Sequence, residues 1–183
     1  MKLYHASKTP GIKHLEPHLS SHRKPYVYAI KDRLTSILFG APKDDFDLLI
    51  MNDGGVTEIY ECYPGSLEKV YKGKGCSLYE VDGEGFSRGV TSWDAEYVNE
   101  NAAPVLNEYR ITDIYAEIMS FVQSGELVIH RFSDDAEYIE FIKDELTSRI
   151  HYFGMTDESM DKDPRFKLYL NEIIGRKASG TEE

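Results

Sequence analysis

The chain has 183 residues, of which 41% are hydrophobic and 12% aromatic, and it carries 21 Lys and Arg against 32 Asp and Glu. This composition can fill a core and excludes wholesale disorder, and the net charge of −11 argues against a protein that tracks a nucleic-acid backbone. No apolar run approaches the roughly 18 residues of a membrane-spanning helix, so we expect no membrane association.

The cysteines and the N-terminus indicate a compartment. Cys62 and Cys76 belong to no Cys-x-x-Cys pair and have no histidine at a metal-ligand spacing. Met1–His5 lacks the apolar core of a signal peptide. We therefore expect reduced thiols in a cytoplasmic protein. Residues 1–40 hold seven basic and two acidic residues, which suits either a small bound anion such as a pyrophosphate or a solvated basic surface.

Strand patterns dominate the first part of the chain. β-Branched and aromatic content predicts strands over 2–5, 26–30, 46–51, 56–60, 77–81, 93–98, 105–111 and 126–132. The segment between 6 and 25 is rich in turn residues and predicts a loop. Asn52-Asp53-Gly54-Gly55 predicts a hairpin turn between the third and fourth strands, because Asn, Asp and Gly tolerate positive φ.

Two short helices are expected among these strands. Asp32 predicts the N-cap of a helix over 33–39, which Gly40 ends. Thr112 or Asp113 predicts the cap of a second helix, which runs to Ser124 and is ended by Gly125.

Beyond Phe132 the residue pattern predicts helices. Ser133 as an N-cap predicts a helix over 134–152, and Asp163-Pro164 predicts the start of a final helix that ends near Gly175. The acidic stretch 155–162 is interpreted as a solvated linker between them.

The predicted fold class is therefore α+β. Residues 1–132 form a split, mostly antiparallel β core with short helices. Residues 133–176 form a C-terminal helical pair, and 177–183 form a flexible tail.

Common catalytic and metal motifs are absent. There is no GxGxxG, Walker A loop, HExxH or GxSxG. His14, His18 and His22 are spaced by four, as on a metal-binding helix face, but Pro17 argues against a helix there. We expect surface-loop histidines and no metal site. A hydrolase with a cysteine nucleophile is poorly supported, because neither cysteine has a recognisable base nearby in sequence.

His5, Tyr28 and Glu96 stand out because each lies on a predicted strand. Alternation along the strand over 93–98 puts Asp94 and Glu96 on one face. A carboxylate among apolar strand neighbours is costly to bury unless it has a partner or a function. Taken singly, each residue has an ordinary structural reading: a satisfied strand-end histidine, a packing tyrosine and a surface glutamate.

Together, these residues resemble a known pattern. Leu3-Tyr4-His5-Ala6-Ser7, then Pro25-Tyr26-Val27-Tyr28-Ala29, then Glu96-Tyr97-Val98 resemble the ADP-ribosyltransferase-like fold superfamily of the His-Tyr-Glu type, in a bacterial-type form. Ala6 stands where the family commonly has Gly. Arginine-directed members carry Glu-x-Glu, whereas Asp94 precedes Glu96 here.

The resemblance implies roles for these residues. His5 would hydrogen-bond the ribose of NAD, Tyr28 would stack on nicotinamide, and Glu96 would stabilise the cation that develops on the nicotinamide ribose. Ser7 is a further candidate for the cofactor-binding set. Arg23, Lys24 and Arg33 lie near these strands in the sequence and are candidates to meet the pyrophosphate. The resemblance implies an intracellular enzyme that transfers ADP-ribose from NAD to an unknown protein or nucleic-acid target.

Two alternatives remain open. The RNA 2′-phosphotransferase branch of the fold needs several arginines around the histidine, and these do not map onto this chain. A non-catalytic interaction module on the same fold is the other alternative, because the apolar stripes of the helical segment 134–175 must pack on something. That partner would be another protein or a second copy, which would make a homodimer.

Overall fold

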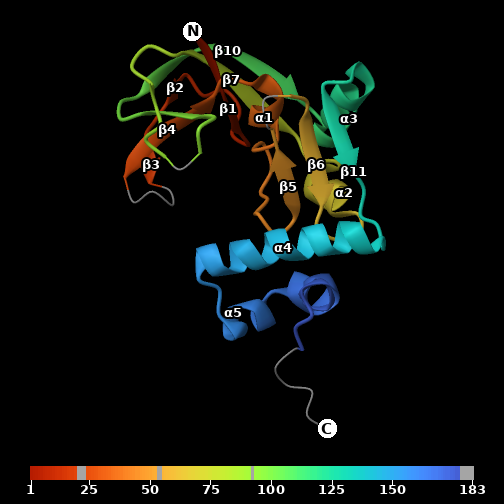
Figure 1. Ribbon diagram of the computed structural model, residues 1–183. Helices are drawn as coiled ribbons and strands as arrows, with labels where there is room; N and C mark the ends of the chain where they lie inside the picture. The colour runs from red at the N-terminus through yellow and green to blue at the C-terminus, as the bar shows by residue number, and fades with distance from the viewer. Residues whose placement is uncertain (20–23, 53–54, 92, 178–183) are drawn as a thin grey trace. The chain divides into compact units, whose positions relative to one another are not determined.

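The computed structural model describes residues 1–19, 24–52, 55–91 and 93–177, and its architecture is α+β (Figure 1). The chain divides into two compact units. Unit 1 comprises Met1–Pro42 and Val70–Ser124, and unit 2 comprises Lys43–Lys69 and Gly125–Glu183. Each unit has its own sheet and its own helices.

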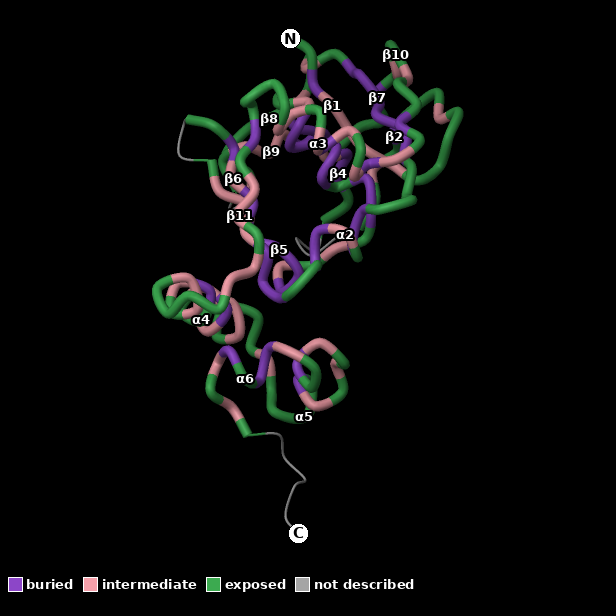
Figure 2. The backbone as a smooth tube through the Cα atoms, turned by 90° about the vertical axis from the view of Figure 1, so that its right-hand side faces the viewer, coloured by how far each residue is buried: buried purple, intermediate pink, exposed green. Residues whose placement is uncertain are grey.

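Unit 1 is built on a sheet that contains eight strands within the described residues, ordered β2-β10-β7-β1-β4-β9-β8, with β3 beside β4. The strands are β1 (Lys2–Ser7), β2 (His14–Leu15), β3 (His18–Leu19), β4 (Pro25–Ile30), β7 (Cys76–Asp82), β8 (Ser87–Arg88), β9 (Glu96–Asn99) and β10 (Ala103–Ile111). Neighbouring strands pair antiparallel. Figure 2 shows the interior strand β7 as a largely buried stretch.

A buried cluster of side chains packs on this sheet. The packed residues share an apolar character: Leu3, Leu15, Val27, Ala29, Tyr79, Val81 and Ala103. Two helices accompany the sheet, α1 (Arg33–Ile37) and α3 (Ile114–Ser124). Asp32 caps α1 by accepting a hydrogen bond from the Thr35 backbone N–H at 2.6 Å. The Ser36 hydroxyl of α1 reaches the Tyr4 carbonyl at 3.3 Å, which holds the helix against β1.

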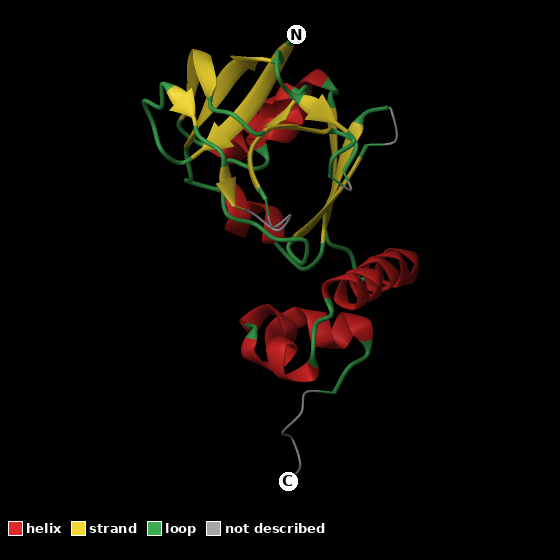
Figure 3. Cartoon of the chain, turned by 90° about the vertical axis from the view of Figure 1, so that its left-hand side faces the viewer, coloured by secondary structure: helices red, strands yellow, loops and turns green. Residues whose placement is uncertain are grey.

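Unit 2 combines a small sheet with a helical group. The strands β5 (Leu48–Met51) and β6 (Thr57–Glu61) form an antiparallel hairpin, and β11 (Leu127–His130) pairs parallel with β6. The helices are α2 (Ser66–Tyr71), which spans a sequence boundary between the units, α4 (Ala136–Phe153), α5 (Asp157–Lys162), the π-helical turn η1 (Phe166–Leu170) and α6 (Asn171–Ile174). The chain after β11 is helical (Figure 3).

The hairpin of unit 2 and its C-terminal helices share one core. Its buried members are apolar apart from one tyrosine hydroxyl: Phe46, Leu49, Cys62, Tyr63, Ile142, Leu146, Met160, Phe166, Leu170 and Ile173. The Tyr63 hydroxyl donates to Asp47 at 2.7 Å. This grouping differs from the boundary expected at residue 132, because β5, β6 and β11 belong to the same compact unit as the helices that follow them.

The predicted α+β class and several predicted elements are confirmed. Strands occur at or near each predicted range, α1 begins after Asp32, and Asp113 caps α3 by accepting from the Ala116 N–H at 3.1 Å. The 52–55 hairpin joins β5 to β6, although Asp53 and Gly54 of its turn lie outside the described residues. His22, Arg23 and the tail from 178 onward also lie outside them.

The C-terminal predictions need correction. Residues 155–162 are not a linker, because a capping box between Thr156 and Ser159 starts α5 there. The cap of α4 is Asp135 rather than Ser133, since the Asp135 carboxylate accepts from the Glu137 N–H at 3.0 Å. The expected final helix is divided into η1 and α6 and ends at Gly175 in a left-handed conformation.

Three further differences lie outside the C-terminal region. The segment expected as a loop before residue 25 contains the two-residue strands β2 and β3. The strand expected over 93–98 begins only at Glu96, so Asp94 lies in the preceding turn. The helix α2 follows Pro64 and Gly65 and was not predicted. Of the described helices, none has the length and apolarity needed to cross a membrane.

Candidate active site

Unit 1 contains a cavity of about 370 Å³. Its wall includes His5, Tyr28 and Glu96, which come from β1, β4 and β9. These three strands are neighbours in the sheet. The three residues singled out from the sequence, separated by 23 and 68 positions along the chain, therefore line one hollow.

The register of the strands explains this convergence. Tyr4 of β1 is paired with Ile30 of β4, and Ile30 is paired with Glu96 of β9. Side chains of directly paired residues project to the same face of a sheet, so these three lie side by side. Tyr28, two residues before Ile30, projects to that same face. Alternation thus delivers both the tyrosine and the glutamate to the cavity.

The sheet opens between β1 and β4 at this point. β1 pairs with β7 along all six of its residues, whereas its described pairing with β4 is limited to Tyr4 and Ile30. The His5 imidazole occupies the opening, and its Nδ1 lies 2.8 Å from the Tyr28 carbonyl oxygen. Backbone groups of alternate residues face the same neighbouring strand, so this carbonyl faces β1 as that of Ile30 does. The imidazole takes the place of a missing ladder bond.

This contact fixes the state of His5. A carbonyl oxygen only accepts, so Nδ1 carries the proton and donates it, which leaves Nε2 as an acceptor. Burial lowers the pKa of His5 below its usual value, and the neighbouring His18 lowers it further, against the opposing effect of the bond to Tyr28. His5 is therefore a neutral imidazole that offers a lone pair on Nε2.

Aromatic rings surround the cavity. Phe39, which follows α1, and Trp93, which precedes β9, lie with their ring centroids 5.5 Å apart, and both are substantially exposed. The His18 ring meets the Tyr28 ring edge-on, with centroids 5.6 Å apart. Flat faces of this kind suit a planar heteroaromatic ligand, and a cationic ring most of all.

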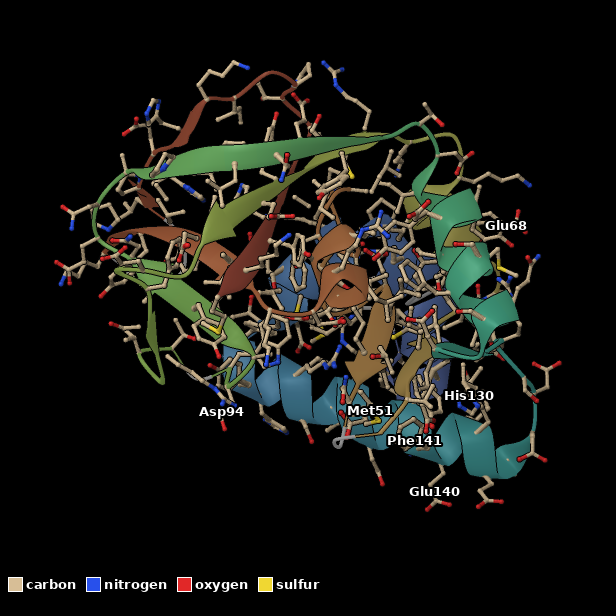
Figure 4. The ribbon with its side chains drawn as sticks, turned by 90° about the horizontal axis from the view of Figure 1, so that it is seen from above. Met51, Glu68, Asp94, His130, Glu140 and Phe141 are labelled. Atoms are coloured by element: carbon tan, nitrogen blue, oxygen red, sulfur yellow. The ribbon has the colours of Figure 1, made fainter. Side chains whose placement is uncertain are left out.

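Glu96 is half-buried at the start of β9, and its backbone N–H is bonded to the Trp93 carbonyl at 3.1 Å. This turn fixes where the carboxylate enters the cavity wall. Asp94, which is labelled in Figure 4, lies two residues earlier and is exposed. It is not among the residues that line the cavity. The structure thus separates the two carboxylates that the sequence placed on one strand face.

The other residues expected to bind a cofactor lie elsewhere. Ser7 lines a second cavity of about 520 Å³, which shares His5 and His18 with the first. Lys24 forms an ion pair with Glu100 at 2.5 Å, and Arg33 forms one with Glu117 at 3.0 Å. Neither basic side chain is part of either cavity wall.

Several wall residues were missed from the sequence. Tyr4, His18, Phe39 and Trp93 reach the cavity through strand register and the packing of α1, which leave no local signal. Among them, Trp93 had the clearest cue, because the only tryptophan of the chain stands three residues before Glu96.

Two observations on the described residues bear on metal and thiol chemistry. No group of three or more His, Cys, Asp or Glu side chains is placed there to hold a metal ion. Burial raises the pKa of Cys62 to about 12 and that of Cys76 to about 11, so neither thiol is poised as a nucleophile.

Comparisons with protein-family models, with curated proteins and with solved structures gave no match to this chain. The class of protein is therefore argued from the cavity itself.

Proposed function

We propose that unit 1 is an ADP-ribosyltransferase-like enzyme that cleaves NAD and transfers ADP-ribose to a protein or nucleic-acid target. The observation that carries the proposal is the meeting of His5, Tyr28 and Glu96 on one cavity wall beside an opened sheet. The volume of about 370 Å³ suits the nicotinamide riboside half of the dinucleotide. The second cavity adjoins the same His5 and His18 side chains and is the proposed place for the rest of the molecule.

In this proposal each residue has a distinct task. The His5 Nε2 accepts a hydrogen bond from a ribose hydroxyl, and the bond to the Tyr28 carbonyl orients the ring. The Tyr28 ring contacts the nicotinamide face, with Phe39 and Trp93 on the same wall. Lys24 and Arg33 stay predicted contacts for the pyrophosphate, and each would have to exchange its present carboxylate partner.

The reaction breaks the bond between the nicotinamide nitrogen and the ribose. Nicotinamide leaves with the bonding electron pair, and positive charge develops on the ribose as in glycoside cleavage. The Glu96 carboxylate stabilises that charge electrostatically. A nucleophilic atom of the target then forms the new bond to the ribose carbon and loses its proton. The leaving group is cationic in NAD, so no strong general acid is required.

The test is the substitution Glu96→Gln, with Asp94→Asn as a matched control. Both exchange a carboxylate for an amide, but only Glu96 lines the cavity. Release of nicotinamide from NAD should fall by about a hundredfold or more in the first variant and stay near wild type in the second. Stabilisation against heat by added NAD should persist in both. Equal rates for wild type and Glu96→Gln would refute the assignment.

The non-catalytic module remains the competing proposal. It predicts a dimer in size-exclusion chromatography at rising concentration and no change in melting temperature with NAD or nicotinamide. The RNA 2′-phosphotransferase reading has less support, because the described part of the cavity wall contains no arginine. We place the enzyme in the cytoplasm, in keeping with two buried free thiols.

A further inference from the structure

Unit 2 contains an apolar groove that the proposed chemistry does not use. Its volume is about 330 Å³, and its wall includes Phe132 after β11, Ile139 of α4, and Leu168 and Tyr169 of η1. Leu168 is 64% exposed although it stands among these apolar neighbours. An exposed leucine beside a hollow of this size marks a surface suited to contact with another molecule.

Charge is concentrated on the same unit. Unit 1 has 11 Lys and Arg and 11 Asp and Glu, so it is neutral, whereas unit 2 has 10 Lys and Arg against 21 Asp and Glu. The whole net charge of −11 therefore belongs to unit 2. An excess of this size attracts cationic partners and speeds their association.

The acidic residues at the groove differ from those elsewhere in unit 2. Arg165 is ion-paired with three aspartates and Arg176 with two, so each of those carboxylates already has a cationic partner within the chain. Asp134 and Glu172, by contrast, line the groove and form no ion pair with a described residue. Its described wall contains no Lys, Arg or His, and Lys167 precedes Leu168 without lining it.

The surface beside the groove is also acidic. Glu137 and Glu140 of α4 are exposed and likewise have no ion-pair partner among the described residues. Figure 4 shows the Glu140 side chain directed outward from α4. Phe141, the next residue of α4, instead packs on Tyr60, with ring centroids 4.9 Å apart. α4 thus presents acidic side chains on its outer side and packs its other side on the core.

We propose that this groove binds a basic segment of a partner protein, one with an apolar side chain flanked by Lys or Arg. The apolar side chain enters between Ile139 and Leu168, and the flanking cations meet Asp134 and Glu172. The Tyr169 ring offers a face to one of those cations. A second copy of this chain is a poor occupant, because it would bring another net charge of −11 to the interface. The inference does not depend on NAD chemistry.

The probe is a fluorescein-labelled peptide of Leu-Lys-Lys-Leu repeats, titrated with the full chain and followed by anisotropy. Peptides with Glu in place of Lys, or Ser in place of Leu, serve as controls. Glu172→Lys tests the groove, and Asp144→Lys is its matched control. Asp144 is an exposed carboxylate of α4 that does not line the groove, so both variants change the net charge equally. Leu168→Ser also tests the groove, and Leu106→Ser is its matched control, because Leu106 of β10 is likewise exposed, at 53%.

The proposal predicts saturable binding of the Leu-Lys peptide alone. Glu172→Lys and Leu168→Ser should each weaken it by at least about fivefold, while the two control variants stay within about twofold of wild type. Circular dichroism should be unchanged, since every substituted side chain is exposed. Three results would overturn the proposal: no saturable binding to wild type, an equal loss in Asp144→Lys, or a wild-type dimer in sedimentation that Leu168→Ser abolishes.

Discussion

The hydrogen bond between His5 and the Tyr28 carbonyl makes a prediction about stability that does not depend on any ligand. In His5→Ala the carbonyl loses its partner at the opening of the sheet, and the half-buried ring leaves a gap. The lost hydrogen bond and the lost packing together should lower the free energy of unfolding by about 2–3 kcal/mol. In His5→Asn the amide nitrogen stands near the position of Nδ1 and keeps a donor for Tyr28, so the expected loss is about 1 kcal/mol.

The pH dependence of the stability difference between wild type and His5→Asn tests the protonation state of His5. The pKa of His5 is lowered in the folded protein, chiefly by burial, so the unfolded chain binds this proton more tightly. The stability that His5 contributes is therefore complete above its usual pKa of about 6.5 and is lost as the pH falls below that value. Asn does not titrate, so the advantage of wild type over His5→Asn should shrink as the pH falls from 7.5 toward 5.5.

The assay is urea denaturation followed by the fluorescence of Trp93, the only tryptophan, which lines the same cavity. Urea denaturation of wild type and both variants at several pH values gives each difference in the free energy of unfolding directly. An advantage of wild type that grows toward low pH would mean that a protonated His5 is favoured in the fold. That result would refute both the tautomer and the acceptor role of Nε2.

Two further predictions concern the framework of the protein. Gly75→Ala would place a Cβ 2.8 Å from the Ile111 carbonyl oxygen, so it should lower the free energy of unfolding by about 1–3 kcal/mol, measured by urea denaturation with circular dichroism. In Gly55→Ala the new Cβ meets no atom within 4 Å, so the denaturation midpoint should stay nearly unchanged. Equal effects of the two substitutions would contradict the packing described. Cys62, whose pKa is raised to about 12, should hold roughly a thousandfold less thiolate at neutral pH than an unperturbed thiol. The raised pKa of Cys76 lowers its thiolate fraction as well. Iodoacetamide should therefore label both cysteines far faster in urea than in native buffer. Labelling at similar rates in the two conditions would show that these thiols are not buried.

Local signals in the sequence account for much of unit 1. The β-branched and aromatic run ending at Ile30 predicts β4, and Asp32 predicts the start of α1, because strand content and capping act over a few residues. The order of His5, Tyr28 and Glu96 also predicts which residues the cavity wall would contain. For β4 and α1 the information lies in neighbouring residues.

The remaining features depend on long-range pairing. The opening at His5 follows from a register in which β1 and β4 meet only at Tyr4 and Ile30, and no short segment encodes that register. The grouping of unit 2 follows from the parallel pairing of Leu127 with Thr57, 70 positions apart. The acidic composition of 155–162 concealed α5, whose one buried side chain, Met160, is its only apolar anchor.

The most direct test of the proposed site uses the single tryptophan as a reporter. Trp93 and Tyr28 line the same cavity, so nicotinamide bound there should quench the Trp93 fluorescence to a saturating limit, with NAD acting likewise and adenosine having no such effect. Tyr28→Ala should weaken the saturable part, while Glu96→Gln should retain it. Quenching by NAD that never saturates, and that matches free tryptophan at every concentration, would contradict the claim that this hollow receives the nicotinamide riboside.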